Sequence, residues 1–491
     1  IRIEWTLPTI TVSGTSNVGE STIVRVAVNG SLASQTGTVT SGDWSITGVS
    51  QPSADQILTV FATDGDGDID DSSESTAIGK YSGSGDMTDM VLNINTLSVG
   101  GTGGQSIAVS DLVTANYDSD QDEDIMYDAE TGSLLVEAAV NSYTAEKIDI
   151  LTTDTLTVSG TETLTTYDLT ITGTLTSGGN STYNVSHDWT NNGTFTQSTS
   201  TVDMNGSTAQ AIGGSTATTF NNLTLSNASA AISANTNFTT DGNLTVNANA
   251  TLTPGAAVVM DGSGTLTGGG TVQVTRTTAT ADFGSQYTIT NKTLTNLTVE
   301  YTGTGQVLTN LTYGHLKISS NAISTGANSA TVGGIFTVGV SGVFTPSSGT
   351  ITFNDGASIS NSGTLTFINV TIAGSASVST SSSFSVSGDW DSSGTFSASA
   401  GTIIFAGADA STQIITGSST FYDFDASTNS NAAGRTLQFA GNSTTTVSGT
   451  WTITGYSGKV ITLQSSDTNN WTINPTAASV TYVDVYRSTN T

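Results

Sequence analysis

The sequence predicts an all-β protein in which a small antiparallel β-sandwich precedes a long parallel β-solenoid, or β-helix. Short segments such as LTVSGT and NLTLSN alternate β-branched or aromatic residues with small polar ones almost from end to end, and turn residues separate them. Each segment offers only three or four apolar side chains on one face, which is too few for a core of its own, so the segments must stack. An aromatic-rich unit also recurs at roughly 50 to 60 residues, a period that suits two or three solenoid coils.

Residues 1–80 form the predicted sandwich. Strand-like segments such as PTITVSGT, STIVRVAVNG and QILTVFATDG follow one another at intervals of roughly ten residues, with turn signals between them. Trp44 and Phe61 are expected in its core.

Residues 81–150 are predicted to be an acidic transition that caps the solenoid. Within it, residues 132–148 (GSLLVEAAVNSYTAEKI) are expected to form one short helix. A helix placed over the first coil would cover a strand edge that otherwise pairs with another chain.

Residues 151–491 form the predicted solenoid. Trp189, Gly193 and Phe195 in HDWTNNGTF have counterparts in GDWDSSGTF, which begins at residue 388. A coil with a few inward apolar side chains is stable only when neighbouring coils cover it, so the repeats should share one continuous interior. Thr and Ser, which make up roughly a third of the chain, suit the exposed face of such strands.

Composition excludes several classes of function. Ten basic against 40 acidic side chains, with a net charge of -30, leave no basic patch for nucleic acid. The absence of cysteine excludes disulfides and thiolate metal sites. No apolar run approaches the roughly 20 residues that a membrane span requires. We therefore expect a secreted protein of a cell surface.

Two acidic ladders are the candidate metal sites. Alternate carboxylates in a loop can turn toward one Ca²⁺ ion, which takes six to eight oxygen ligands. Neither ladder has the Gly and the closing Glu of the helix-loop-helix calcium pattern, and the alternative is a solvated acidic loop. We expect structural Ca²⁺ at one or both, with the ligands Asp64, Asp66, Asp68 and Asp70 in the first ladder and Asp118, Asp120, Asp122 and Asp124 in the second.

No catalytic motif is present, and we predict that the protein is not an enzyme. His187 and His315, the only histidines, are interpreted as surface or coil residues. Aromatic residues at strand spacing are more often packed than bound to sugar, although surface glycans remain a candidate partner. The aromatic residues weighed in this way are Tyr301, Tyr313, Tyr422, Tyr456 and Trp471.

The N-terminal residues are the candidate assembly strand. Ile1, Ile3, Trp5 and Leu7 alternate with polar residues, as in a strand with one apolar face. Such a strand either pairs within its own sandwich or completes the sheet of a neighbouring copy. Strand donation of this kind, repeated head to tail, builds an open filament.

Two resemblances add to this interpretation. The segment from DWSITGV to LTVFATDGDGD resembles the bacterial immunoglobulin-like modules of large adhesins. HDWTNNGTFTQSTSTVDMNG and GDWDSSGTFSASAGTIIFAG resemble the parallel β-solenoid repeats of microbial cell-surface adhesins, over residues from about 150 to 486. The resemblance implies cell adhesion or scaffolding, and we expect a self-assembling surface filament, sheath or layer. The alternatives are a monomeric adhesin stalk and a polysaccharide-acting β-helix enzyme.

Overall fold

The computed structural model describes residues 7–63, 75–94, 96–102, 105–109, 111, 142–278, 282–320, 323, 326–427 and 433–490. It confirms an all-β protein with a long parallel β-solenoid of about 17 turns, in which 2% of the residues are helical. Contacts divide the chain into two compact units. The first extends to Leu252 and includes Met260–Thr265 and Ile289–Asn291, and the second comprises Thr253–Val259, Leu266–Thr288 and the chain from Lys292 onward.

The N-terminal part of the first unit contains two small sheets. One has the order β4-β1-β7, with β1 antiparallel to β4 and parallel to β7. In the other, β3, β2, β5 and β6 are antiparallel neighbours. These strands are β1 (Thr9–Ser16), β2 (Ile23–Val28), β3 (Ser31–Thr38), β4 (Asp43–Ser50), β5 (Ile57–Thr63), β6 (Ser75–Lys80) and β7 (Met87–Leu92).

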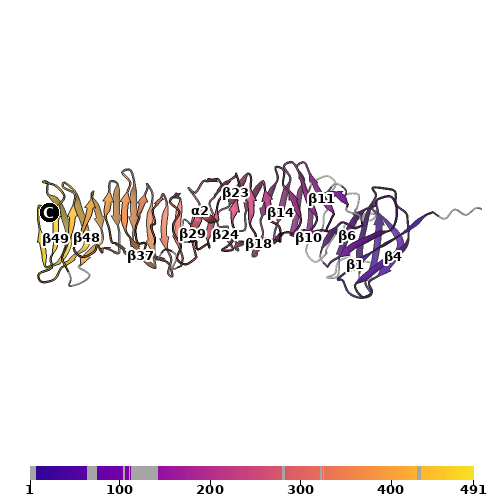
Figure 1. Ribbon diagram of the computed structural model, residues 1–491, viewed down its shortest axis with the longest axis horizontal. Helices are drawn as coiled ribbons and strands as arrows, with labels where there is room; N and C mark the ends of the chain where they lie inside the picture. Colours follow the sequence, from indigo (N-terminus) through magenta and orange to yellow (C-terminus); the bar gives the residue numbers. More distant parts are fainter. Residues whose placement is uncertain are drawn as a thin grey trace, which may run out of the picture. The chain divides into compact units, whose positions relative to one another are not determined.

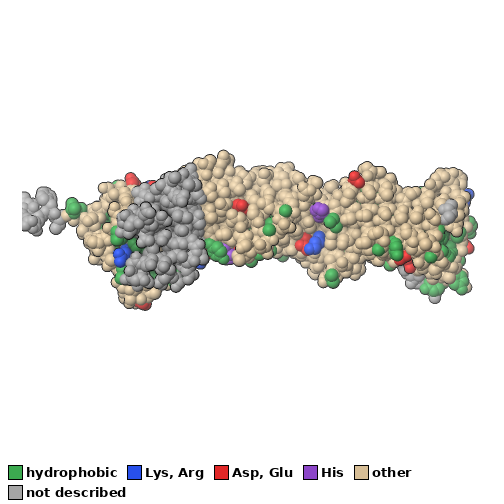
Figure 2. Space-filling model, turned by 180° about the vertical axis from the view of Figure 1, so that it is seen from behind, with side chains coloured by type: hydrophobic (Ala, Val, Ile, Leu, Met, Phe, Trp, Pro, Cys, Tyr) green, Lys and Arg blue, Asp and Glu red, His purple; other side chains and the backbone are tan. Residues whose placement is uncertain are grey.

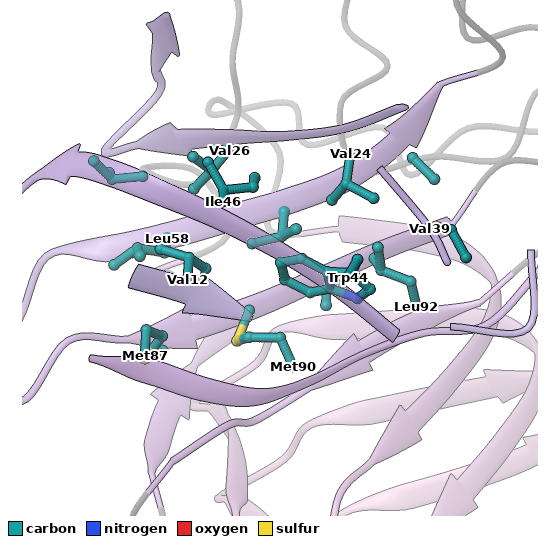
Figure 3. Close-up of a cluster of buried hydrophobic side chains, with 14 of the residues drawn as sticks. Val12, Val24, Val26, Val39, Trp44, Ile46, Leu58, Met87, Met90 and Leu92 are labelled. Atoms are coloured by element: carbon teal, nitrogen blue, oxygen red, sulfur yellow. The ribbon is translucent and has the colours of Figure 1, made fainter. Parts of the chain in front are cut away.

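One hydrophobic cluster lies between these sheets (Figure 3). Val12, Trp44 and Met90 come from the first sheet, whereas Val24 and Leu58 come from the second. The Trp44 indole donates a hydrogen bond to the Thr15 carbonyl at 3.1 Å. Trp44 and Phe61 are both buried, as their place in strand-like segments predicted.

The second small sheet continues directly into the solenoid. Strand β6 pairs in parallel with β8 (Leu97–Val99), and β8 pairs in parallel with β10 (Ser142–Ile150). The expected helix over 132–148 is therefore wrong for residues 142–148, which lie in β10; residues 132–141 fall outside the described part. Ile148 and Ile150 are buried on alternate positions, and this period of two belongs to a strand.

The coils of the first unit stack in parallel, one on the next (Figure 1). Thr163 pairs with Thr182, and Thr182 pairs with Thr201, so these coils advance by 19 residues. The strands from Ser106 to Asp261 are β9 (Ser106–Ala108), β11 (Thr155–Ser159), β12 (Thr163–Ile171), β13 (Thr174–Gly178), β14 (Thr182–Val185), β15 (Trp189–Asn191), β16 (Thr194–Thr196), β17 (Thr201–Met204), β18 (Gln210–Gly213), β19 (Thr218–Phe220), β20 (Asn222–Leu225), β21 (Ile232–Ala234), β22 (Phe238–Thr240), β23 (Asn243–Val246), β24 (Thr251–Pro254) and β25 (Met260–Asp261).

The coils of the second unit stack by the same parallel pairing, and one short helix, α2 (Asp282–Gln286), interrupts the strands. The strands from Thr265 to Asn490 are β26 (Thr265–Gly268), β27 (Thr271–Val274), β28 (Asn291–Lys292), β29 (Thr298–Tyr301), β30 (Thr312–Tyr313), β31 (His315–Ile318), β32 (Ala330–Val332), β33 (Ile335–Val338), β34 (Val343–Phe344), β35 (Thr350–Phe353), β36 (Ser358–Asn361), β37 (Thr364–Phe367), β38 (Asn369–Ile372), β39 (Ser377–Thr380), β40 (Phe384–Val386), β41 (Trp390–Ser392), β42 (Thr395–Ala398), β43 (Thr402–Phe405), β44 (Thr412–Thr416), β45 (Ser419–Phe421), β46 (Asp423–Ser427), β47 (Arg435–Phe439), β48 (Thr444–Thr454), β49 (Ile461–Ser465), β50 (Trp471–Thr481), β51 (Val483–Val485) and β52 (Ser488–Asn490).

Inward side chains form continuous apolar stacks because the register keeps like positions together. In the first unit one stack contains Leu164, Tyr183, Val202, Leu223 and Leu244, each paired with the next and all buried. Neighbouring coils cover both sides of every inner member, so each gains the burial that it could not have alone.

The two Trp-containing repeats are structurally equivalent. Trp189 packs against Phe195 with ring centroids 5.0 Å apart, and Trp390 packs against Phe396 at 4.7 Å. Each indole N–H donates to a hydroxyl 29 residues further along the chain. The acceptor is Thr218 for Trp189 and Ser419 for Trp390. The aligned aromatic residues thus mark the same place in the coil.

Buried glutamines form hydrogen bonds between successive coils. In the second unit, Gln413 accepts a hydrogen bond from the Gly407 N–H at 3.3 Å and donates from Nε2 to the carbonyls of Val386 (2.9 Å) and Gly388. The same pattern joins Gln210 to Gly206, Val185 and His187, and joins Gln306 to Gly303, Val274 and Arg276. These glutamines satisfy backbone groups that the corners of the coils would otherwise leave buried and unpaired.

The face drawn in Figure 2 is mostly uncharged outside its grey atoms. In this view, few side chains of Asp, Glu, Lys, Arg and His are visible, and most of the drawn surface is backbone or other side chains. No helix in the described part of the chain has the length and apolarity that a bilayer crossing requires.

Candidate functional site

Aspartates at coil corners accept backbone hydrogen bonds from the next coil. Asp188 Oδ1 accepts the Ala211 N–H at 2.7 Å, and Asp389 Oδ1 accepts the Ile414 N–H at 2.8 Å. Each of these aspartates immediately precedes a repeat tryptophan, so alternation turns the carboxylate outward and the indole inward. In these two repeats the Asp-Trp pair therefore marks a corner of the coil, whereas Asp43 and Trp44 lie within β4.

At one corner of the first unit, two such aspartates lie beside a histidine. Asp168, in β12, and Asp188, just before β15, lie one coil apart on the outer side. His187 Nδ1 is 2.7 Å from Asp168 Oδ1 and 3.8 Å from Asp188 Oδ2. The imidazole stacks on the Tyr167 ring at 4.6 Å and 8°, which fixes its plane. Within the described residues, this is the one group of three His or acidic side chains whose ligand atoms all lie within 4.8 Å of one another.

A groove of about 220 Å³ opens beside this cluster. Asp149, Asp168 and Asp188 contribute carboxylates to its lining, and Lys147 contributes an ammonium. Burial raises the pKa of the Asp149 carboxyl, and a hydrogen bond from the Thr172 hydroxyl lowers it in part. The groove is thus acidic, and one of its carboxyls holds a proton more tightly than usual.

The chemistry available at this cluster is proton exchange or the binding of a cation. Carboxylate oxygens and an imidazole nitrogen are the donors that divalent transition metals take in proteins. The three side chains are only partly exposed, so their geometry is set by the coil corners rather than by solvent.

A second groove, of about 320 Å³, lies in the second unit and has a different character. Arg435 and Lys459 contribute to its lining. Arg435 is buried and donates to the carbonyls of Phe405 and Gly407 and to Gln413 Oε1, and burial lowers the pKa of its guanidinium. Its charge serves the stacking of coils, so we assign this groove no ligand.

The expected calcium ladders and most of the expected assembly strand lie outside the described residues. These are Asp64, Asp66, Asp68, Asp70, Asp118, Asp120, Asp122, Asp124, Ile1, Ile3 and Trp5. Leu7, the remaining member of the strand, is 76% exposed.

The structure separates the five aromatic residues weighed for sugar binding. Tyr301, Tyr313 and Trp471 are buried, so the packing interpretation holds for them, whereas Tyr422 and Tyr456 are about 40% exposed. They belong to different corners of the coils and form no common platform.

Sequence reasoning missed the cluster around His187. Asp168 and Asp188 differ by 20 positions, which is one coil, so the coil period makes them neighbours. That period becomes exact enough for such a pairing only when the strand register is known. The available signal was that Asp168 and Asp188 are separated by about one coil length.

Comparisons with protein families, with curated proteins and with solved structures give no match for this chain.

Proposed function

We propose that the chain is an extracellular structural protein, a subunit of a self-assembling cell-surface filament, sheath or layer with an adhesive or scaffolding role. In this proposal the N-terminal sheets form an immunoglobulin-like module, and neighbouring copies contact one another through the solenoid. One observation carries the proposal: the coil that contains β50 and β51 exposes large apolar side chains.

The exposed side chains of that coil are Val480, Tyr482, Val485 and Tyr486, each 43 to 57% exposed. An apolar coil surface suits strand pairing with another copy, because pairing covers the side chains and adds main-chain hydrogen bonds.

The composition of the surface fits a secreted location. The net charge of -30 keeps copies soluble at low concentration, and the mostly uncharged outer face leaves few charges to oppose stacking. Donation of the strand that contains Ile1, Ile3, Trp5 and Leu7 supplies the complementary contact. Surface glycans are the partners that an adhesive role requires.

Assembly is tested by electron microscopy and light scattering of the purified chain over a range of concentrations. Ordered fibres or sheets are expected, and removal of residues 1–7 should abolish them. The double variant Tyr482→Ser, Tyr486→Ser should also prevent assembly, whereas Tyr422→Ser, on a side-facing tyrosine of similar exposure, should not. Single particles at high concentration would instead support the monomeric adhesin stalk.

Calcium at the two acidic ladders is part of the same proposal. Bound Ca²⁺ would neutralise carboxylates that repel one another and would stiffen the segments that carry them. Calorimetry of the full chain with Ca²⁺ and with a chelator checks this: binding to the folded state raises the melting temperature. An unchanged melting temperature removes calcium from the proposal.

A second candidate function, a polysaccharide-acting β-helix enzyme, is favoured by the acidic groove. Asp149, with its raised pKa, has the property of a general acid, and Asp168 and Asp188 supply further carboxylates. Release of reducing ends from acidic and neutral polysaccharides, lost in Asp149→Asn, would establish it. No release by the wild-type chain leaves the structural role.

A further inference from the structure

Three side chains from two successive coils converge at one corner of the first unit. Asp168 comes from β12, and His187 and Asp188 come from the turn that precedes β15, so parallel stacking brings the three together. His187 is one of two histidines in 491 residues, and it lies where two corner aspartates are already stacked. The Nδ1 of the other histidine, His315, accepts a hydrogen bond from the Ile335 N–H at 3.1 Å.

The distances suit a small divalent transition ion. Two ligand atoms about 2.0 to 2.1 Å from a tetrahedral Zn²⁺ lie about 3.3 Å apart. The two contacts of His187 Nδ1, 2.7 Å to Asp168 Oδ1 and 3.8 Å to Asp188 Oδ2, lie on either side of that value. Shifts of about half an ångström within partly exposed side chains would bring each of these two pairs to the separation that Zn²⁺ requires, and the carboxylate oxygens of Asp168 and Asp188 already lie within 4.8 Å of each other.

The protein also holds the ligand groups in place. The Asp188 N–H donates to Asp168 Oδ1 at 3.0 Å, the Ala211 N–H donates to Asp188 Oδ1, and the Tyr167 ring stacks on the imidazole. Hydrogen bonds that orient metal-binding side chains in this way commonly raise metal affinity.

The electrostatic surroundings favour a cation. Asp149 adds a third carboxyl to the adjacent groove, and Lys147, opposite Asp168 in the strand register, is the basic residue of its lining. The two carboxylates of Asp168 and Asp188 outnumber the one ammonium, which leaves net negative charge at the corner. The groove gives an ion and its water ligands a route from solvent.

We propose that His187 Nδ1 and one carboxylate oxygen each of Asp168 and Asp188 bind a divalent transition-metal ion of the Zn²⁺ type, with water in the remaining position. The ion joins two successive coils near the start of the solenoid. This site is separate from the acidic ladders, whose oxygen-only donors suit Ca²⁺; the imidazole selects a softer ion.

The test is a titration of the full chain with Zn²⁺ in the presence of millimolar Ca²⁺, which occupies oxygen-only sites. Calorimetry should give one Zn²⁺ per chain. Loss of groups that only orient ligands weakens binding about 10- to 100-fold, so His187→Ala, which removes a ligand, should weaken it at least about 100-fold. The matched control His315→Ala should bind as the wild type does.

Two further measurements keep the proposal open to refutation if His187→Ala folds poorly. Asp188→Asn retains an oxygen that accepts the Ala211 N–H but loses the carboxylate charge, so it should fold and bind Zn²⁺ at least about tenfold more weakly. In NMR spectra, Zn²⁺ should shift the imidazole resonances of His187 and leave those of His315 unchanged. Wild-type protein without saturable binding, or His187→Ala with wild-type affinity, would overturn the proposal.

Discussion

Replacement of Gln413 by leucine tests whether the buried glutamines hold the coils together. Leucine has a similar volume, so the change removes hydrogen bonds without leaving a large cavity. The carbonyl of Val386 keeps a second partner, the Ala406 N–H at 2.8 Å, and Arg435 Nη1, which also donates to Gln413, keeps the Gly407 carbonyl. The Gly407 N–H and the Gly388 carbonyl lose the partners that Gln413 gives them. Each orphaned buried group costs about 1 to 3 kcal/mol, so the expected loss of local stability is about 2 to 6 kcal/mol.

Hydrogen–deuterium exchange is the suitable assay because a solenoid unfolds coil by coil and global melting averages over many coils. A loss of 2 to 6 kcal/mol corresponds to exchange faster by about 30-fold to about 10⁴-fold for amides of residues 402–416. Amides of residues 182–225, in the other unit, should be unchanged. The control is Gln438→Leu, on the outer face of β47, for which a change within about 0.5 kcal/mol is expected. Equal protection in the two variants would refute the reasoning.

The remaining predictions concern charge and backbone conformation. Burial raises the pKa of the Asp203 carboxyl, so the folded state disfavours its ionised form; Asp203→Asn should therefore stabilise the protein at pH 7, and the gain should vanish below about pH 3.9, where the carboxyl is protonated in both states. Burial raises the pKa of the Glu300 carboxyl, but the Lys317 ammonium and two uncharged side chains lower it by more, so its pKa is lowered overall. Glu300→Gln should therefore destabilise the protein at pH 7, and the difference should fade as the pH falls. Urea unfolding of the Asp203 and Glu300 variants at pH 3 and pH 7 checks both predictions, and effects that do not depend on pH would contradict the assigned pKa shifts. Gly417 and Gly458 share a φ of 73°, but a Cβ at Gly417 would lie 1.7 Å from a backbone oxygen, whereas a Cβ at Gly458 meets nothing within 4 Å. In melting experiments Gly417→Ala should therefore lower the free energy of unfolding by several times the roughly 1 kcal/mol expected for Gly458→Ala. Equal losses in the two variants would show that the backbone adjusts.

The stacking of coils was predictable from the sequence because it follows from alternation and from a shortage of apolar side chains. A strand such as β20, with Leu223 and Leu225 buried and Thr224 between them, has one possible inner face. The alignment of Trp189 with Trp390 succeeded because each large ring packs against an equivalent phenylalanine, Phe195 or Phe396.

The features that sequence reasoning missed depend on the register between coils. The expected helix failed at β10 because pairing with β8 and β12 gives residues 142–150 neighbours that local propensity ignores. The glutamine bridges and the His187 cluster join residues one coil or more apart, and coil length varies: Thr182 pairs with a residue 19 positions on, whereas Phe424 pairs with Trp451. A shift of one residue turns an inward side chain outward, so the partners of a polar residue cannot be read from an average period.

The parallel pairing of each coil with only its two neighbours has a mechanical consequence. Tension on the chain loads the outermost coil first, since that coil has a partner on one side only. As each coil becomes the outermost one, its detachment releases its own length before the next coil bears the force. For the coils around Thr182 this length is 19 residues, or about 60 Å of contour. Under load the molecule should therefore lengthen in regular steps and dissipate work at each one, as an extensible tether does.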